Sequence, residues 1–306
     1  MHEISVVIPC YKAEQTIERA VRSVLAQPAV SAQVIVVVDG ASNETLAVLS
    51  GIVDDRLSVL VNEENRGAPA SRNRGLAVAA HPLVMFLDSD DYVIGNLLSG
   101  LAHSIVEGDA DVAFGPWIWL DEAQNMIRRN VRRFSSATDA VEQMLLGGKF
   151  VHPSATLWRR DFLSSIGGWD QDLARFQDVE LALRGILLGA RTAISTIGSG
   201  VYVQHSSANR ITGSRTNAES LLLAANRLLA IDSKVVPEAR KRAAVGGFLY
   251  NIGRGLARGE RKELGQQFID KARDLGWTPF SAFRHSQSRE LFARQQYQRL
   301  RAMLVR

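Results

Sequence analysis

Residues 82–92 read PLVMFLDSDDY, an apolar run that ends abruptly in the carboxylates of Asp88, Asp90 and Asp91. A short, nearly continuous apolar run is typical of a strand that is buried on both faces of a parallel sheet. Carboxylates this close repel one another and raise one another's pKa, unless a positive group lies among them. The stretch therefore predicts a strand that ends in a polar site, together with a counter-charge for that site.

Similar apolar runs precede this one: EISVVIP (3–9), QVIVVVD (33–39) and RLSVLVN (56–62). Between the first two, apolar residues recur at spacings of three and four, which predicts a helix over residues 13–27. A further helix is expected at residues 96–107 and a further strand at 111–115. Strands that alternate with helices indicate βαβ units and a doubly wound α/β sheet.

The composition is that of a soluble globular protein, with 306 residues, of which 46% are hydrophobic and 22% charged. No apolar run approaches the roughly 18–20 residues of a membrane span, and the N-terminus lacks the segments of a signal peptide. Cys10 is the single cysteine, which excludes an intrachain disulfide. We expect it to be a small buried apolar residue rather than a nucleophile.

The charge is distributed unevenly along the chain. Residues 235–306 hold 15 Lys or Arg against 6 Asp or Glu, a net charge of +9, whereas the whole chain carries +4. This region is predicted to be almost wholly helical, as are residues 218–229 before it. Such a basic tail could lie against anionic lipid headgroups, a partner protein or nucleic acid, or it could be a solvated helical surface.

The acidic turn is a candidate metal site. In open parallel sheets, ligands bind beyond the carboxyl ends of the strands. Asp88 and Asp90 lie two positions apart and can aim their carboxylates into one crevice, where oxygen ligands suit Mg²⁺ or Mn²⁺. The ion would supply the counter-charge and bind the phosphate oxygens of a substrate. The alternative is that Asp90 or Asp91 caps the helix that follows.

The order of motifs along the chain identifies a protein family more specifically than any single motif does. SVVIPCYK, VVVDGASNET, NRGAPASRNRG and FLDSDDY are followed by GGWDQDL (167–173), FQDVELALR (176–184) and YVQHSS (202–207). Over roughly residues 3–210 this order resembles glycosyltransferase family 2, whose members have the GT-A fold. The resemblance implies a mostly parallel, Rossmann-like sheet flanked by helices, as a catalytic domain over residues 1–212. The basic helical extension over residues 213–306 matches no motif.

The resemblance also implies transfer of a sugar from a nucleoside diphosphate donor to an acceptor hydroxyl, with inversion at the anomeric carbon. It places a divalent ion, Mn²⁺ or Mg²⁺, on Asp88, Asp90 and His205, although a lone histidine can equally be a hydrogen-bonded surface residue. The positions that it assigns to the donor are Pro9, Tyr11, Asp39, Arg72, Asp88 and Ser89. Gly40 departs from the family's Asp-Asp-Gly turn, so the identity of the nucleotide base stays open. Uracil is favoured by family frequency alone.

Asp178 is the candidate general base, the group that takes the proton of the attacking hydroxyl. Helix capping is the alternative for this residue. Gln177 precedes it, where the family usually has Glu. The resemblance assigns Trp169, Asp170 and Glu180 to the acceptor. Trp169 could instead be a core aromatic residue, and Glu180 could orient the substrate rather than react.

We therefore expect a metal-dependent, inverting glycosyltransferase of polysaccharide or surface-glycan synthesis, acting in the cytoplasm on a glycan or lipid-linked acceptor. A catalytically inactive nucleotide-sugar-binding or scaffold protein is the alternative, motivated by Gly40 and Gln177. A Rossmann dehydrogenase is set aside, because no Gly-x-Gly-x-x-Gly turn follows the first strand. The tail contains no recognisable nucleic-acid-binding module, so we expect peripheral contact with the inner face of the plasma membrane instead.

Overall fold

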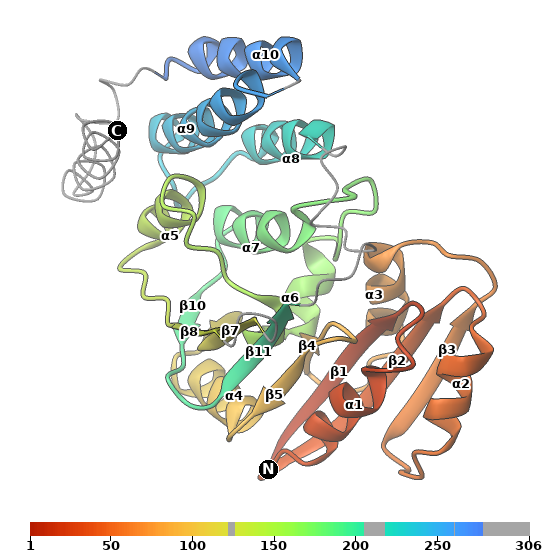
Figure 1. Cartoon of the computed structure of the whole chain (residues 1–306). Helices are drawn as coiled ribbons and strands as arrows, with labels where there is room; N and C mark the ends of the chain where they lie inside the picture. The colour runs from red at the N-terminus through yellow and green to blue at the C-terminus, as the bar shows by residue number, and fades with distance from the viewer. Residues whose placement is uncertain (122–125, 205–217, 260, 278–306) are drawn as a thin grey trace.

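The computed structural model describes residues 1–121, 126–204, 218–259 and 261–277, and its centre is a seven-stranded sheet (Figure 1). The strands lie in the order β10-β6-β9-β4-β1-β2-β3. In chain order they are β1 (His2–Cys10), β2 (Val30–Asp39), β3 (Leu57–Asn62), β4 (Leu83–Phe86), β6 (Val112–Phe114), β9 (Thr156–Arg159) and β10 (Thr192–Ile194). β1 pairs in parallel with both β2 and β4, so the carboxyl ends of these three strands meet at one edge.

The strands predicted in the first 115 residues are all present, and the expected mostly parallel sheet flanked by helices is confirmed. The exception is β9, which lies antiparallel between β4 and β6. Cys10 at the end of β1 is buried, as expected, and burial raises the pKa of its thiol to about 12.

The helices cover both faces of the sheet. They are α1 (Ile17–Leu25), α2 (Asn43–Ser50), α3 (Ala68–Ala77), α4 (Leu97–Glu107), α5 (Ala137–Leu145), α6 (Arg160–Ser165), α7 (Gln177–Leu187), α8 (Ala218–Ala230), α9 (Glu238–Ala257) and α10 (Lys262–Asp274). Alternate side chains of β1 enter two separate cores: Val6 and Ile8 pack with α1, α2 and α4, whereas Val7 packs in the core of α5 to α10. Because side chains alternate across a strand, one apolar run supplies both cores.

The helix that was predicted from residue 13 begins four residues later, at Ile17. The N–H groups of Thr16 and Ile17 both donate to the carbonyl of Ala13, at 3.0 and 2.9 Å. Residues 13–16 therefore form a turn that leads into α1, and the apolar residues that recur at spacings of three and four begin only at Ile17.

A second sheet of four strands, in the order β5-β11-β7-β8, lies beside the first. Its strands are β5 (Tyr92–Ile94), β7 (Trp117–Asp121), β8 (Met126–Asn130) and β11 (Ser199–Gln204). β5 directly follows the acidic turn and pairs antiparallel with β11. This sheet therefore brings residues of the second half of the chain next to the end of β4.

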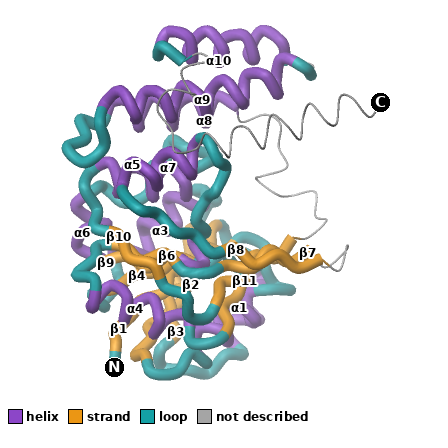
Figure 2. Tube along the Cα trace, turned by 90° about the vertical axis from the view of Figure 1, so that its left-hand side faces the viewer, coloured by secondary structure: helices purple, strands orange, loops and turns teal. Residues whose placement is uncertain are grey.

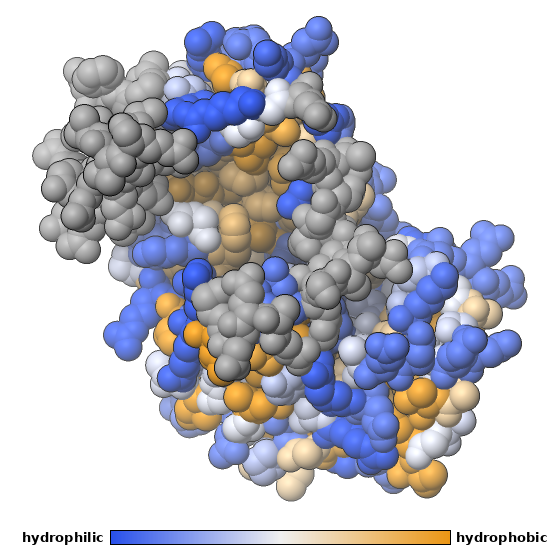
Figure 3. All heavy atoms as spheres, in the orientation of Figure 1, coloured by the Kyte–Doolittle hydropathy of each residue, from blue (hydrophilic) through white to orange (hydrophobic). Residues whose placement is uncertain are grey.

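The C-terminal helices α8, α9 and α10 stack beyond α5 and α7, on the side away from the sheet (Figure 2). Buried residues of α8 and α9 belong to the same core as those of α5 and α7, and Arg240 of α9 pairs with Glu142 of α5. On the face in Figure 3, an apolar recess opens between these helices and the α/β part. The boundary at residues 212/213 stays a prediction. Among the described helices, none is both long and apolar enough to cross a membrane.

Candidate active site

The positive group beside the acidic turn is Arg72 of α3, which is buried. Its Nη2 donates to Asp88 Oδ1 at 2.5 Å, and its Nη1 donates to Gln177 Oε1 at 2.7 Å. Its guanidinium carbon lies 4.2 Å from the centre of the Trp169 ring, within cation–π range. One arginine therefore joins the end of β4, the start of α7 and the loop before α7. The strand end and the candidate base on α7 belong to one assembly.

Two neighbours of Arg72 on α3 fix its position. Asn73 donates from Nδ2 to the Trp169 carbonyl and accepts from the Trp169 N–H on Oδ1, both at 2.8 Å. At Gly75, an added Cβ would come within 2.3 Å of the Val7 side chain. Only glycine therefore lets α3 lie this close to β1, and Asn73 ties the helix to the loop that carries Trp169.

His152 is a member of the site that the sequence analysis missed. Its Nδ1 lies 2.7 Å from Ser154 Oγ, and its ring centre lies 4.8 Å from that of Tyr202. Burial lowers the pKa of the His152 ring, although the nearby carboxylates of Asp88 and Asp178 act in the opposite direction. Burial therefore favours the neutral imidazole. A histidine before a proline carries no distinctive sequence signal, which is why it was missed.

The charge of Asp88 is set mainly by Arg72. Burial would raise the pKa of Asp88, but the charge of the Arg72 guanidinium and its hydrogen bond outweigh burial and hold this pKa below its ordinary value. Asp88 is thus ionised at neutral pH, and about a third of its side chain is exposed. The resemblance implied a metal ion as the counter-charge, whereas for Asp88 the structure gives this role to Arg72.

Asp178 lies half-buried in the first turn of α7. Phe176, the N-cap residue, makes no side-chain capping bond, and among the described residues the Asp178 carboxylate has no hydrogen bond to the first turn of α7, so capping by Asp178 is not supported. The residue before α7, Phe176, has φ +67° and ψ +13°, the left-handed region. This conformation costs a non-glycine residue about 1–2 kcal/mol, so packing has to hold it.

The packing comes from two other phenylalanines. The Phe176 ring stacks on Phe248 of α9, with ring centres 4.8 Å apart, and meets Phe150 edge-on at 5.8 Å. Aromatic pairs of this kind contribute about 0.5–1.5 kcal/mol beyond the area that they bury. The C-terminal extension therefore holds the residue that precedes Gln177 and Asp178.

We expect Phe248→Leu to lower the free energy of unfolding by about 1 kcal/mol and to speed amide exchange at residues 177–180. Leucine keeps the apolar contact but loses the stacking that holds Phe176. Phe162→Leu is the control, because Phe162 stacks on Trp158 with ring centres 6.5 Å apart. It is expected to lose similar stability without faster exchange at the start of α7. Unchanged exchange there in Phe248→Leu would contradict the role given to the stack.

The carboxylates of Asp39 and Asp91 are both held by hydrogen bonds from other elements of the fold. Asp39 is buried, with Oδ1 accepting from Asn62 Nδ2 at 2.8 Å and Oδ2 accepting from the Gly67 N–H at 2.8 Å. Asp91 is also buried, and its Oδ1 accepts from the Val203 N–H at 3.1 Å. Asp39 thus holds β2, β3 and the start of α3 together, and Asp91 ties the turn to β11. Contact of Asp39 with a base stays a prediction.

The remaining donor positions lie at the same edge of the sheet. Pro9 is buried at the end of β1, and Tyr11 just beyond it has half of its surface exposed. Ser89 and Asp90 are half-buried in the turn after β4. The structure thus brings the donor set together around the ends of β1, β2 and β4.

Two residues assigned to the acceptor are in the core. Trp169 is 3% exposed, with its edge against Phe86 and its face covered by Arg72. The alternative reading as a core aromatic therefore fits it, and a sugar-stacking role does not. Glu180 is 1% exposed and binds Arg184 through both oxygens, at 2.8 and 3.1 Å. It braces α7 and does not face an acceptor.

Asp170 lies closer to the surface, and its Oδ2 is 3.4 Å from Arg227 Nε of α8. This ion pair links the Gly-Gly loop to the C-terminal helices. His205 lies outside the described residues. Within the described ranges, no group of three His, Cys, Asp or Glu side chains could hold a metal ion. Asp88 and Asp90 still fit Mg²⁺ or Mn²⁺, because such ions are often held by one or two carboxylates plus substrate phosphates.

The family model for glycosyl transferase family 2 matches residues 5–167. The chain belongs to this family. It is 31% identical over 259 residues to the succinoglycan biosynthesis protein ExoU of Rhizobium meliloti, which covers 78% of this chain and 72% of ExoU. Over 112 residues, 37% of this chain and 44% of the relative, it is 32% identical to WfgD of Escherichia coli, a UDP-Glc:alpha-D-GlcNAc-diphosphoundecaprenol beta-1,3-glucosyltransferase.

The fold of this family 2 glycosyltransferase is confirmed by a solved structure. The crystal structure of S. aureus TarS 1-349 in complex with UDP-GlcNAc matches it with a TM-score of 0.71, at 20% identity, over 90% of this chain and 80% of that one. The GT-A fold expected from the motifs is therefore present.

Gly40 stands where the family's Asp-Asp-Gly turn has its second aspartate, and the local backbone explains this difference. Gly40 has φ +86°, and an added Cβ would meet the Asn65 backbone at 3.4 Å. An aspartate here would be strained in the left-handed region. The turn after β2 is therefore built for glycine, and Asp39 alone supplies a carboxylate there.

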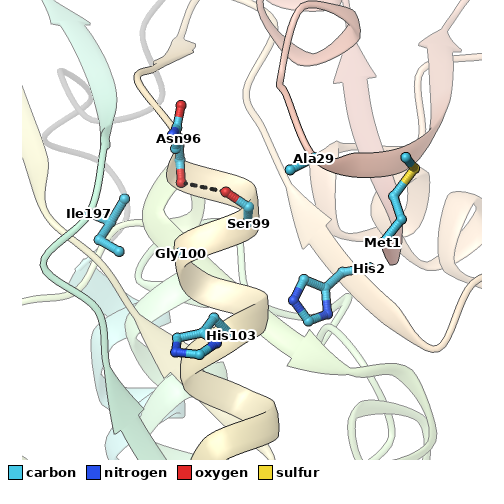
Figure 4. A pocket seen from close by; sticks show the side chains of 8 residues that line it. All are labelled: Met1, His2, Ala29, Asn96, Ser99, Gly100, His103 and Ile197. Carbon is cyan, nitrogen blue, oxygen red and sulfur yellow. Dashed lines mark hydrogen bonds between the residues drawn. The ribbon is translucent and has the colours of Figure 1, made fainter.

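A cavity of about 520 Å³ lies at the amino end of β1, away from the candidate active site (Figure 4). It is lined by His2 and His103, among others, and Ser99 Oγ donates to the Asn96 carbonyl beside it at 3.2 Å. The amino ends of parallel strands are not where ligands gather in such sheets. Size alone therefore does not identify the site in this glycosyltransferase.

Proposed function

We propose that the chain is a metal-dependent, inverting glycosyltransferase that moves a sugar from a nucleoside diphosphate donor to an acceptor hydroxyl. The observation that carries the proposal is the Arg72 linkage, which joins Asp88 at the end of β4 to Gln177, the neighbour of Asp178. Transfer needs a site for the leaving diphosphate and a carboxylate for the attacking hydroxyl, close to one reacting carbon. Asp88 and Asp178 meet these two needs from two elements that one arginine holds together.

In the transfer step, Asp178 accepts the proton of the acceptor hydroxyl while the hydroxyl oxygen forms its bond to the anomeric carbon. The bond from this carbon to the diphosphate oxygen breaks on the opposite side, and its electron pair leaves with the diphosphate. Attack opposite to departure inverts the configuration. Arg72 keeps Asp88 ionised and in place.

Asp88, Asp90 and His205 are the residues that we propose for Mn²⁺ or Mg²⁺. When bound, such an ion stabilises the negative charge that accumulates on the leaving diphosphate. Pro9, Tyr11, Asp39 and Ser89 would then surround the nucleotide at the edge of the sheet. Of the predicted acceptor positions, Asp170 alone keeps exposed surface near the site.

Relatives support a uridine diphosphate donor and a surface-glycan product. TarS was crystallised with UDP-GlcNAc, WfgD is named for UDP-Glc and a diphosphoundecaprenol acceptor, and ExoU is named for succinoglycan synthesis. We therefore propose a UDP-sugar donor and an acceptor in surface-glycan assembly. Contact of the basic extension with the inner membrane surface belongs to the same proposal and is motivated by its net charge of +9 over residues 235–306.

A thermal-shift screen tests metal and base together. We expect UDP to raise the melting temperature in the presence of Mn²⁺, and GDP or dTDP to raise it less. Ligand at a hundredfold excess over its Kd stabilises by about 2.7 kcal/mol. Asp90→Asn is expected to remove the Mn²⁺ dependence, whereas Asp55→Asn, in an exposed turn, is the matched control. No shift with any diphosphate would overturn the proposal, and binding without donor turnover would favour the inactive alternative.

A further inference from the structure

A pocket of about 480 Å³ lies between the strand β8 region and α5, outside the site described above. Four cationic side chains line it: Arg129, Arg132, Arg133 and Lys149. We call it the cationic pocket. Its volume lies within the range of small-ligand sites in proteins, about 300–1,000 Å³.

The four cations have no carboxylate partner within the described part of the chain. Arg132 Nε donates to the Phe150 carbonyl at 2.9 Å, Arg129 Nη2 to the Thr196 carbonyl at 3.5 Å, and Lys149 Nζ to Gln143 Oε1 at 3.3 Å. Elsewhere arginines pair with acids, as Arg191 does with Asp111 and Arg240 with Glu142. The pocket is therefore a concentration of positive charge in which none of the four cations forms an ion pair with a carboxylate of the described residues.

One carboxylate lies close to the pocket without cancelling its charge. Asp139 accepts from the Ser135 N–H and from Gln143 Nε2, at 2.8 and 2.9 Å. Burial acts to raise the pKa of Asp139, but these hydrogen bonds and the charge of Lys149 hold it below its ordinary value. A single ionised acid against four cations leaves the pocket strongly positive.

Arg132 and Lys149 are half-buried, whereas Arg129 and Arg133 are exposed. Burial lowers the pKa of the Arg132 guanidinium, and no described carboxylate offsets the effect. Burying an unpaired charge is costly, and such charges are normally paired. A guanidinium held in this way is preorganised to bind an anion, because its fork of N–H donors matches phosphate and carboxylate oxygens.

The pocket adjoins the candidate active site. The Arg132 guanidinium carbon lies 5.8 Å from the centre of the Trp117 ring, and the Trp117 ring lies 5.4 Å from the ring of His152. His152 in turn interacts electrostatically with Asp88 and Asp178. The Phe150 carbonyl that holds Arg132 is two residues from His152 in the chain. The rings of Trp117 and His152 therefore lie between the Arg132 guanidinium and the carboxylates of the candidate active site.

We propose that the cationic pocket binds a phosphate group of the acceptor, either a diphosphate on a lipid carrier or a phosphate of a soluble glycan. Four cations favour a group with more than one negative charge over a neutral sugar. This inference rests on the proposed function, because it takes the ligand to be the acceptor of the transfer. It adds the chemical class of that acceptor.

The test measures binding of inorganic pyrophosphate to the full chain by calorimetry, with EDTA present so that no metal carries phosphate to the donor site. We expect Arg132→Gln/Arg133→Gln to weaken binding about 100-fold, tenfold for each lost charge. Arg133→Gln alone, at an exposed position, covers the case in which the double variant does not fold. Arg273→Gln on α10 is the matched control and is expected to change the affinity less than twofold.

A second arm separates the two sources of the phosphate. Farnesyl diphosphate is presented in neutral phosphatidylcholine vesicles. If the protein binds it more tightly than pyrophosphate, with the same dependence on Arg133, the phosphate belongs to a lipid carrier. Equal affinity for the two supports a soluble phosphate. Equal pyrophosphate binding by wild type and both variants, or none by the wild type, would overturn the proposal. UDP binding with Mn²⁺ is measured in parallel, so that a failure of the proposed function itself is seen separately.

Discussion

Replacement of Asp178 by asparagine is expected to slow sugar transfer by about 10²–10⁴-fold, the usual contribution of a general base. Asparagine has nearly the same shape as aspartate but cannot accept the proton of the acceptor hydroxyl. The side chain does not cap α7, so the helix is expected to stay in place. The measurement is the initial rate of UDP release at saturating UDP-sugar and acceptor, with UDP affinity determined by calorimetry.

The matched control for this variant is Asp172→Asn. Asp172 lies in the loop before α7 and pairs with Arg227 at the surface. Its charge is removed in the same neighbourhood while the backbone hydrogen bond and the Arg227 ion pair of Asp170 remain, so transfer is expected to stay within about twofold of wild type. Unchanged transfer in Asp178→Asn would remove Asp178 from the mechanism. Loss of UDP affinity together with transfer would instead assign it to the donor.

The strands and their convergence were predictable because they rest on local patterns. Continuous apolar runs can be buried only between two layers of helices, and parallel pairing then brings the strand ends at Asp39 and Asp88 to one edge. The antiparallel strand β9 was not predictable, because TLWR carries no signal of direction and its place between β4 and β6 is fixed by contacts distant in the chain.

The roles of single residues in the site were less predictable, because partners lie far apart in sequence. Arg72 and Gln177 are 105 residues apart, so the sequence showed neither their hydrogen bond nor the burial of Trp169 beneath Arg72. Glu180 and Arg184 are four residues apart on α7, a spacing at which opposite charges commonly pair on a helix. This spacing was visible in FQDVELALR and was the signal that could have corrected the acceptor assignment.

The second large effect is expected for Arg72→Met, which removes the charge and the hydrogen bonds while keeping an apolar side chain of similar length. The free energy of unfolding is expected to fall by about 2–3 kcal/mol, because Asp88 and Gln177 lose their charged partner. Urea denaturation at pH 7 measures this loss. Transfer is expected to fall about 100-fold or more, because Arg72 joins the end of β4 to the start of α7.

The pH dependence distinguishes loss of the Asp88 pair from a general packing defect. The pKa of Asp88 is lowered in the folded protein, so the stabilisation by Arg72 is fully present above the ordinary aspartate pKa of about 3.9 and is lost as the pH falls through the lowered value. The stability gap between wild type and Arg72→Met is therefore expected to narrow in acid. Arg191→Met, which breaks the ion pairs with Asp109 and Asp111 away from the candidate site, is the control and should leave transfer unchanged. A gap that is constant between pH 7 and pH 3 would mean that Arg72 acts through packing on Trp169 and not through the charge of Asp88.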